Sequence, residues 1–271
     1  MVYYNEHDPF AAQWLRNLME ARWLPRGDVD ERDIQDVAPV DLVGYRQCHF
    51  FAGIGGWPYA LRLSGWPDEE PVWTGSCPCQ PFSVTGYRLG TTDARHLWPD
   101  FFRLIAECRP PVVFGEQVAS KAGRGWLAGV RADLERVGYA VGAADLPAAS
   151  VCAPHIRQRL WWVADADGGH SSDRPLQRGR RHDEQPKDEA LQRTGRREEG
   201  AATGRTDASC WSDYVLVHCA DGKTRRLEPG CEPLADGFSG RVGRLRAYGN
   251  AIVPQVAAEF IKSYLKAVDF S

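Results

Sequence analysis

The chain has 271 residues, of which 43% are hydrophobic and 25% are charged, and these are ordinary values for a globular protein. This length accommodates one large domain, or one domain with a small appendage, and the composition excludes a wholly disordered chain or a fibre. Lys and Arg total 33 against 36 Asp and Glu, which gives a net charge of −3. A uniformly basic coat is therefore excluded, and any nucleic-acid surface has to be a local patch.

Neither a membrane span nor a secretory signal is predicted. No apolar run approaches the roughly 18 residues that a span needs, and residues 1–6 have no basic or apolar region of the signal-peptide kind. The cysteines have no spacing typical of a disulfide framework, and Cys77 and Cys79 are too close for the usual pair of metal ligands. We therefore expect a cytoplasmic protein without a bound metal.

Strands and helices are predicted to alternate over residues 1–165. Asp8 and Pro9 are typical of a helix start, and Gly65 and Gly138 of helix ends. Strands are predicted at 2–4, 48–51, 72–74, 112–114, 139–141 and 160–164, and helices at 9–19, 59–63, 98–108 and 127–137. This alternation is typical of an α/β fold with a largely parallel sheet.

The composition changes after Ala166. Residues 171–207 are dense in charge, with Leu176 and Leu191 as the large apolar residues, so they cannot bury enough surface to offset the cost of ordering. We expect a mobile insert there. Residues 214–227 predict a β-hairpin with a Gly-containing turn, and residues 252–271 predict one amphipathic helix.

A glycine cluster, Phe51-Ala52-Gly53-Ile54-Gly55-Gly56, lies between a predicted strand and a predicted helix. Glycines in such a turn let the backbone approach a ligand, and they leave the N–H groups at the helix start free to bind it. A tight turn without a ligand is the alternative.

Cys79 lies in the segment Pro78-Cys79-Gln80-Pro81-Phe82-Ser83, directly after a predicted strand. Attacking groups are usually found at the mouth of an α/β sheet, where the carboxyl ends of the strands meet. The flanking prolines and polar residues favour a loop over the alternative, a buried structural cysteine.

Five motifs, in this order, resemble those of DNA cytosine-5 methyltransferases. Residues 51–56 resemble that family's cofactor motif, and Pro78-Cys79-Gln80 resembles its nucleophile motif. Glu116-Gln117-Val118 stands where the family has Glu-Asn-Val, residues 155–159 stand where it has Gln-x-Arg-x-Arg, and residues 249–254 resemble its C-terminal motif. The resemblance implies a Rossmann-like sheet of the class I S-adenosylmethionine-dependent methyltransferases, with a small target-recognition lobe. His49, Gln117 and His155 depart from the family pattern.

The order of the cofactor motifs is permuted in this chain. In the family a much longer segment separates the glycine motif from Pro-Cys-Gln, whereas here it is residues 57–77. The missing parts resemble segments at the front of the chain: Asn5-Glu6-His7-Asp8-Pro9 resembles the ribose-binding acidic motif, and Gly27-Asp28-Val29 resembles the adenine-contacting Gly-Asp-Ile. We therefore expect the second and third strands of the cofactor half to come first. The alternative is that Glu6 is a surface acid and Asp28 a turn residue.

The resemblance implies a role for each matching residue. Cys79 is the nucleophile that adds to C6 of cytosine, Glu116 hydrogen-bonds N3 and the exocyclic amine, Arg159 contacts O2, and Arg157 supports the loop. Solvated arginines on an edge strand and a buried structural glutamate are the alternatives. Residues expected to bind S-adenosylmethionine are Phe51, Gly53, Gly55, Gly56, Glu6, His7, Asp28 and Asn250. Residues expected to contact DNA are Gln80, Ser83, Thr85, Arg88, Arg225 and Arg226.

The predicted organisation is a catalytic and cofactor-binding domain at 1–165, a target-recognition region at 166–245 that contains the insert, and a C-terminal helix at 246–271 that returns to the catalytic domain. The expected partner is double-stranded DNA, from which cytosine is flipped, and the expected state is a monomer. A small recognition region favours a short target sequence. The alternatives are a tRNA or other RNA cytosine-5 methyltransferase, a relative that transfers a different group, and a relative that only binds DNA.

Overall fold

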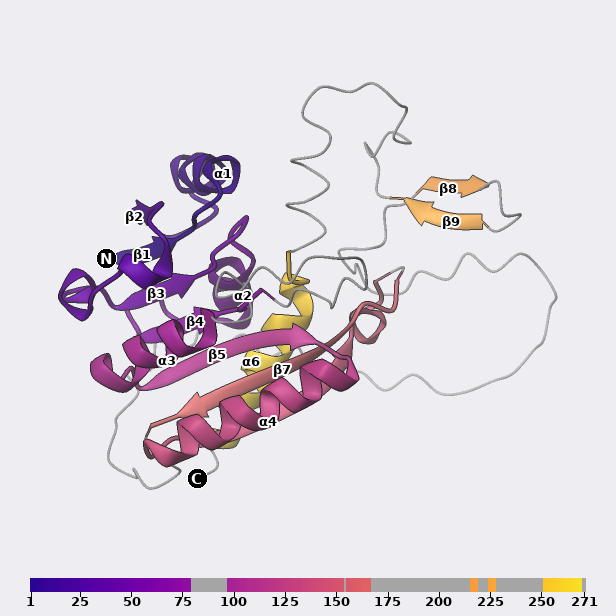
Figure 1. Cartoon of the computed structure of the whole chain (residues 1–271). Helices are drawn as coiled ribbons and strands as arrows, with labels where there is room; N and C mark the ends of the chain where they lie inside the picture. Colours follow the sequence, from indigo (N-terminus) through magenta and orange to yellow (C-terminus); the bar gives the residue numbers. More distant parts are fainter. Residues whose placement is uncertain (79–96, 154, 167–214, 219–223, 228–250, 270–271) are drawn as a thin grey trace, which may run out of the picture.

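The computed structural model describes residues 1–78, 97–153, 155–166, 215–218, 224–227 and 251–269, and everything below concerns these residues (Figure 1). The strands are β1 (Val2–Asn5), β2 (Gly27–Asp30), β3 (Gln47–Phe50), β4 (Val72–Gly75), β5 (Val112–Val118), β6 (Ala140–Pro147), β7 (Gln158–Asp165), β8 (Val215–His218) and β9 (Thr224–Leu227). The helices are α1 (Pro9–Glu20), α2 (Gly56–Ser64), α3 (Leu97–Cys108), α4 (Lys121–Arg136) and α6 (Pro254–Asp269), with short 3-10 turns η1 (Ile34–Asp36), η2 (Pro39–Leu42) and η4 (Ala148–Val151). The predicted α/β fold is confirmed.

Seven strands form one mixed sheet in the order β2-β1-β3-β4-β5-β7-β6. The strands β2, β1, β3, β4 and β5 are all parallel to one another. β7 is antiparallel to both of its neighbours, β5 and β6. A largely parallel sheet is therefore confirmed, with β7 as the reversed strand. The predicted hairpin is confirmed as β8 and β9, which pair antiparallel.

The strand order brings the segments that follow β1 and β3 together. β1, which precedes Glu6, lies between β2 and β3, and β3 leads into the glycine cluster. Parallel strands end at the same edge of a sheet, so the segments after β1 and β3 are neighbours there although the chain reaches them in the reverse of the usual family order.

Helices cover both faces of the sheet, and alternate residues of each strand point to opposite faces. On one face, α3 and α4 pack on residues such as Phe50 and Val113. On the other face, α2 and α6 pack on residues such as Phe114 and Trp161, and α1 packs on β1. Figure 1 shows α4 in front of β5 and β7, and α6 (yellow) behind them.

The helix boundaries follow local chemistry. The carboxylate of Asp8 accepts hydrogen bonds from the N–H groups of Phe10 and Ala11, and Pro9 is the first helical residue of α1. Gly65 ends α2 with a left-handed backbone, φ +83°. Within the described ranges, no helix is long and apolar enough to cross a membrane, and no group of three or more His, Cys, Asp or Glu side chains forms a metal site.

Candidate active site

The glycine turn, residues 51–55 between β3 and α2, is held in a conformation that ordinary residues avoid. Phe51, Gly53 and Gly55 all have positive φ, at 52°, 55° and 82°. For Gly53 and Gly55, glycine removes the steric cost of this backbone. Within the turn the N–H groups of Ala52, Gly53 and Gly55 already donate to Asn5, Glu6 and Ala52. The N–H groups available to a ligand are therefore those at the start of α2, which have no partner within the helix.

Glu6 closes onto the glycine turn. Its Oε2 accepts a hydrogen bond from the N–H of Gly53 at 2.6 Å, and its Oε1 accepts one from the N–H of Asp8 at 2.8 Å. A carboxylate has about four acceptor positions, so each oxygen retains one for a further donor, such as a hydroxyl. The surface-acid alternative for Glu6 is therefore wrong, while His7 is exposed beside it.

The C-terminal segment packs against the glycine turn. The side chain of Ile252 lies over Gly56, and a Cβ at position 56 would come within 2.6 Å of Ile252 Cγ1. A cavity of about 430 Å³ adjoins this contact and is lined by Ile54, Gly55 and Gly56, residues 251–255, His155 and Arg157, and by apolar side chains of α1, α2 and the segment after α1. Asn250 lies outside the described residues.

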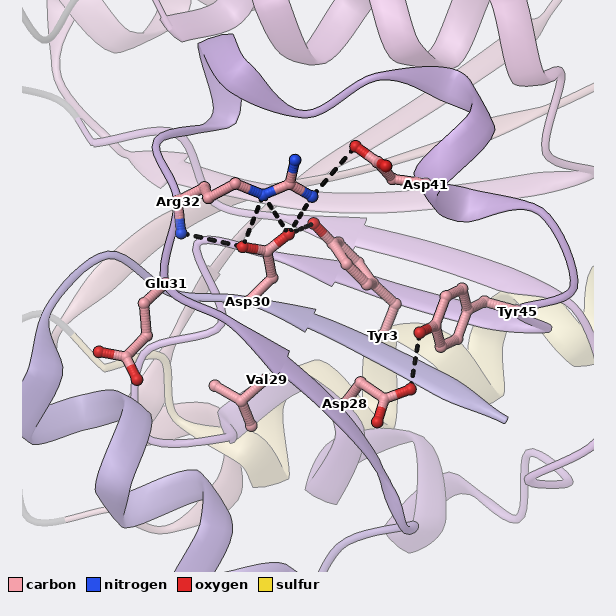
Figure 2. Close-up of a pocket in the computed structure, with 8 residues that line it drawn as sticks. All are labelled: Tyr3, Asp28, Val29, Asp30, Glu31, Arg32, Asp41 and Tyr45. Carbon is pink, nitrogen blue, oxygen red and sulfur yellow. Dashed lines mark hydrogen bonds and ion pairs between the residues drawn. The ribbon is translucent and has the colours of Figure 1, made fainter.

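Asp28 lies away from the glycine turn. It is a strand residue opposite Tyr3 in the β1–β2 pairing, so the turn-residue alternative is wrong. Its Oδ2 accepts a hydrogen bond from the hydroxyl of Tyr45 at 2.6 Å. Both residues line a cavity of about 340 Å³, together with Tyr3 of β1, the rest of the end of β2 and the loop that follows it (Figure 2). An adenine contact by Asp28 stays a prediction. Tyr45 occupies one of the acceptor positions of the Asp28 carboxylate, which has about four.

Asp30, rather than Asp28, forms the carboxyl end of β2. Its backbone oxygen accepts from the N–H of Glu6 at 3.0 Å, which places it level with the predicted ribose-binding residue. Its carboxylate is already occupied by the hydroxyl of Tyr3 at 2.7 Å and by the guanidinium of Arg32 at 2.6 Å (Figure 2). Asp30 therefore stabilises the loop that follows β2.

Glu116 and Arg159 form an ion pair across β5 and β7. Arg159 Nε lies 2.7 Å from Glu116 Oε1, and Glu116 is only 8% exposed. Burial raises the pKa of Glu116 more than the charges of Arg159 and Arg157 lower it. The carboxyl group therefore takes up a proton more readily than a free glutamate, and a protonated carboxyl can donate to a ring nitrogen.

Arg157 connects this pair to the C-terminal segment. Its Nη2 donates to the backbone oxygen of Ala251 at 2.6 Å, and its backbone has an unusual φ of 27°. β7 lies between β5 and β6, so the alternative of two solvated arginines on an edge strand is wrong. Arg157 and Arg159 instead lie beside a buried acid.

The loop after β4 is anchored by Trp57, which the sequence motifs do not include, and by Gln117, which belongs to the Glu116-Gln117-Val118 motif. Trp57 Nε1 donates to Ser76 Oγ at 3.0 Å, and the Ser76 hydroxyl is a hydrogen-bond partner of Glu116. Gln117 Nε2 donates to the backbone oxygen of Cys77 at 3.3 Å. Cys77 is buried, and burial raises the pKa of its thiol, so it does not supply a thiolate.

Several predicted site residues cannot be placed. Cys79, Gln80, Ser83, Thr85 and Arg88 lie outside the described residues. Arg225 and Arg226 belong to β9, whose backbone alone is described. Their roles, like the domain boundaries beyond residue 166, stay predictions.

Comparison with known proteins identifies a family. A family model for C-5 cytosine-specific DNA methylases matches residues 1–207. The Type II methyltransferase M.AplI of Arthrospira platensis is 37% identical over 99 residues, covering 36% of this chain and 29% of that protein. M.HhaI of Haemophilus parahaemolyticus is 27% identical over 168 residues, covering 47% and 51%. The chain thus spans about half or less of the length of these curated relatives.

Among solved structures, a DNMT2 mutant of Spodoptera frugiperda matches with a TM-score of 0.42 and 16% identity, over 66% of this chain and 45% of that one.

Proposed function

Because the chain belongs to the C-5 cytosine-specific DNA methylase family, we propose that it methylates C5 of cytosine in double-stranded DNA. Membership of this family implies S-adenosylmethionine as the methyl donor. The observation that carries the proposal is the ion pair between buried Glu116 and partly buried Arg159. Glu116 belongs to β5, the strand next to β4, which leads to Cys79, and Arg159 belongs to β7, the strand beyond β5. The glycine turn with Glu6 follows β3, on the other side of β4.

The residues around the glycine turn fit the proposed donor. Glu6 keeps an acceptor position on each oxygen for the two ribose hydroxyls, and the start of α2 offers backbone N–H groups. Phe51 is half-buried against Phe101, with ring centroids 6.1 Å apart, and its remaining face is suited to an adenine ring. In this proposal Gly53, Gly55, Gly56 and Asn250 line the methionine end. When bound there, S-adenosylmethionine supplies an electrophilic methyl group.

In the proposed reaction, the thiolate of Cys79 forms a bond to C6 of cytosine, and the electron pair of the C5–C6 double bond becomes available at C5. Charge accumulates on the ring as this bond forms. Glu116, whose pKa is raised by burial, donates its proton to N3 and accepts from the exocyclic amine, which offsets that charge. Arg159 contacts O2 of the base. After C5 gains the methyl group, its proton passes to water, and the electron pair of that C–H bond re-forms the C5–C6 double bond. The bond between sulfur and C6 breaks with its electron pair on sulfur, which regenerates the thiolate, and N3 returns its proton to Glu116.

A cytosine that is stacked in a duplex cannot contact Glu116, because the carboxyl group is buried near the carboxyl end of β5. Base flipping is therefore part of the proposal. Thr85, Arg88, Gln80 and Ser83 contact DNA in a loop that closes on it, and Arg225 and Arg226 of the hairpin contribute phosphate or base contacts. A short target sequence, a monomer and a cytoplasmic setting complete this proposal.

The proposal is tested with purified protein, S-adenosylmethionine labelled in the methyl group, and two substrates: duplex DNA and tRNA. Label is expected in 5-methylcytosine of the duplex only. Label in tRNA alone would instead support an RNA methyltransferase, and a labelled group heavier than methyl would support a different transfer.

Two variants connect the activity with the site. Glu116→Gln keeps the shape of the side chain but cannot donate a proton to N3, so turnover is expected to fall by about 10²- to 10⁴-fold. Arg131→Ala removes an exposed ion pair with Glu135 on α4 and is the matched control, with activity expected within twofold. Equal activities of these two variants would contradict the assigned role of Glu116.

A further inference from the structure

Ser76 lies between the helix that follows the glycine turn and the buried glutamate. It follows β4 directly, and it belongs to none of the motifs that resemble the family's. Its hydroxyl oxygen receives a hydrogen bond from Trp57 Nε1 at 3.0 Å. Gly75 pairs with Gly115 in the β4–β5 register, so the residues that follow them, Ser76 and Glu116, are neighbours, and the Ser76 hydroxyl favours the carboxylate of Glu116. Ser76 is half-buried, so both contacts are partly shielded from water.

The direction of these hydrogen bonds follows from chemistry. An indole N–H only donates, so Ser76 Oγ accepts from Trp57. A carboxylate only accepts, so the hydroxyl proton of Ser76 is directed to Glu116. The Ser76 hydroxyl therefore has one orientation in which it accepts from Trp57 and donates to Glu116 at the same time.

Trp57 is itself fixed by packing. It is 3% exposed, its ring stacks on Phe114 with centroids 6.1 Å apart, and it meets Trp161 edge-on at 5.6 Å. Phe114 and Trp161 belong to β5 and β7, the strands that carry Glu116 and Arg159. The indole N–H is therefore held in a fixed position relative to the ion pair.

We propose that Ser76 is a positioning residue for Glu116: its hydroxyl, oriented by Trp57, holds the carboxyl group in place for the cytosine ring and links it to the helix after the glycine turn. This inference rests on the proposed function, since it assigns Glu116 to the base. It adds a residue on which the reaction depends without contact to substrate.

The proposal predicts a change in how Glu116 titrates. Three described groups face its carboxyl: Arg159 from β7, Arg157 from the loop before β7, and Ser76 from the loop after β4. The hydrogen bond from Ser76 favours the carboxylate and lowers the pKa, against the effect of burial. Ser76→Ala removes this contribution and leaves both arginines, so the pKa of Glu116 rises.

The test uses the full chain with glutamate carboxyl groups labelled with ¹³C, and Glu116→Gln identifies the Glu116 signal. Ser76→Ala is expected to raise the midpoint of that signal. Trp57→Phe, which keeps an aromatic ring but removes the N–H, is expected to shift it the same way by a smaller amount. Ser64→Ala, which removes a hydroxyl bonded to the backbone oxygen of Leu61 on α2, is the matched control without a shift. Unchanged midpoints in Ser76→Ala would overturn the proposal.

Kinetics provide a second readout. The kcat of Ser76→Ala is expected to fall about tenfold with both KM values within twofold, because Ser76 positions Glu116 for the reaction and does not itself contact either substrate. In the pH profile of kcat for Ser76→Ala, the decrease at high pH is expected to begin at a higher pH than in the wild type, in line with the shifted titration of Glu116. A KM effect without a change of kcat would overturn the proposal. If the wild type does not methylate DNA while the midpoint of Ser76→Ala still shifts, the proposed function fails and the positioning of Glu116 by Ser76 stands.

Discussion

Gly56→Ala adds one methyl group at the contact between the glycine turn and the C-terminal segment. The added Cβ would lie 2.6 Å from Cγ1 and 3.4 Å from Cδ1 of Ile252. Carbon atoms pack at roughly 3.5–4.0 Å, so Ile252 has to move. Gly56 does not have a left-handed backbone, and the expected cost is therefore steric rather than conformational.

The magnitude follows from two opposing effects. Overpacking of this kind lowers the free energy of unfolding by about 1–3 kcal/mol, and replacing glycine by alanine in a helix returns about 1 kcal/mol. The net loss is therefore about 0–2 kcal/mol. With Ile252→Ala in the background, Cγ1 and Cδ1 are gone and the nearest remaining atom is Cβ at 3.9 Å, an ordinary contact. Gly56→Ala is then expected to raise the free energy of unfolding by about 1 kcal/mol.

The assay is urea unfolding of four proteins: the wild type, Gly56→Ala, Ile252→Ala and the double variant. The two changes are expected to be coupled by about 1–3 kcal/mol. If Gly56→Ala costs the same in both backgrounds, Ile252 does not lie over Gly56, and the C-terminal segment does not close the cofactor end as described.

Three further predictions concern named side chains. Burial lowers the pKa of His49 from 6.5 to about 3, so the unfolded chain binds a proton that the folded chain rejects; stability is full above pH 6.5 and falls as the pH drops toward 3. By pH 5 the loss is about 2 kcal/mol, which urea unfolding of wild type and His49→Gln at pH 7.5 and 5 measures; an equal loss in both proteins would contradict it. Arg157→Ala frees the Ala251 backbone and is expected to weaken S-adenosylhomocysteine binding about tenfold by calorimetry without DNA, whereas Arg159→Ala stays within twofold; equal weakening would refute the link. Glu6→Gln replaces a charged acceptor by a neutral one and is expected to weaken the same binding about tenfold or more, and unchanged affinity would remove Glu6 from the cofactor site.

The elements that the sequence predicts well are those with local chemical signals. Asp8 and Pro9 start α1, and Gly65 ends α2, because capping and backbone conformation depend on a few neighbouring residues. The adjacency of Glu6 and Gly53 was also predictable, since parallel strands end at the same edge of a sheet.

The lengths of the later strands were not predictable in the same way. β5 was predicted at 112–114 but extends through Glu116 to Val118, and β6 extends to Pro147. Both extensions pair with the antiparallel strand β7, which is a tertiary contact. Gly115 has a weak preference for strands, but a Cβ there would lie 2.1 Å from the ring of Trp162, so packing requires glycine in this strand.

The candidate site was likewise predictable only where local sequence signals define it. A motif such as Gly27-Asp28-Val29 carries no information about strand register, and the register places Asp30 rather than Asp28 at the end of β2. Trp57 and Ser76 carried no recognisable signal, because a tryptophan in a helix and a serine in a loop are usually structural. Their relation to Glu116 depends on three separate elements meeting in space.

The central claim is cytosine methylation through Cys79 and Glu116, and nucleoside mass spectrometry of DNA from expressing cells tests it most directly. 5-Methylcytosine is expected with the wild type and with Arg131→Ala, and not with Cys79→Ala or Glu116→Gln. The same amount of 5-methylcytosine with Cys79→Ala, or no modified cytosine with the wild type, would contradict the claim.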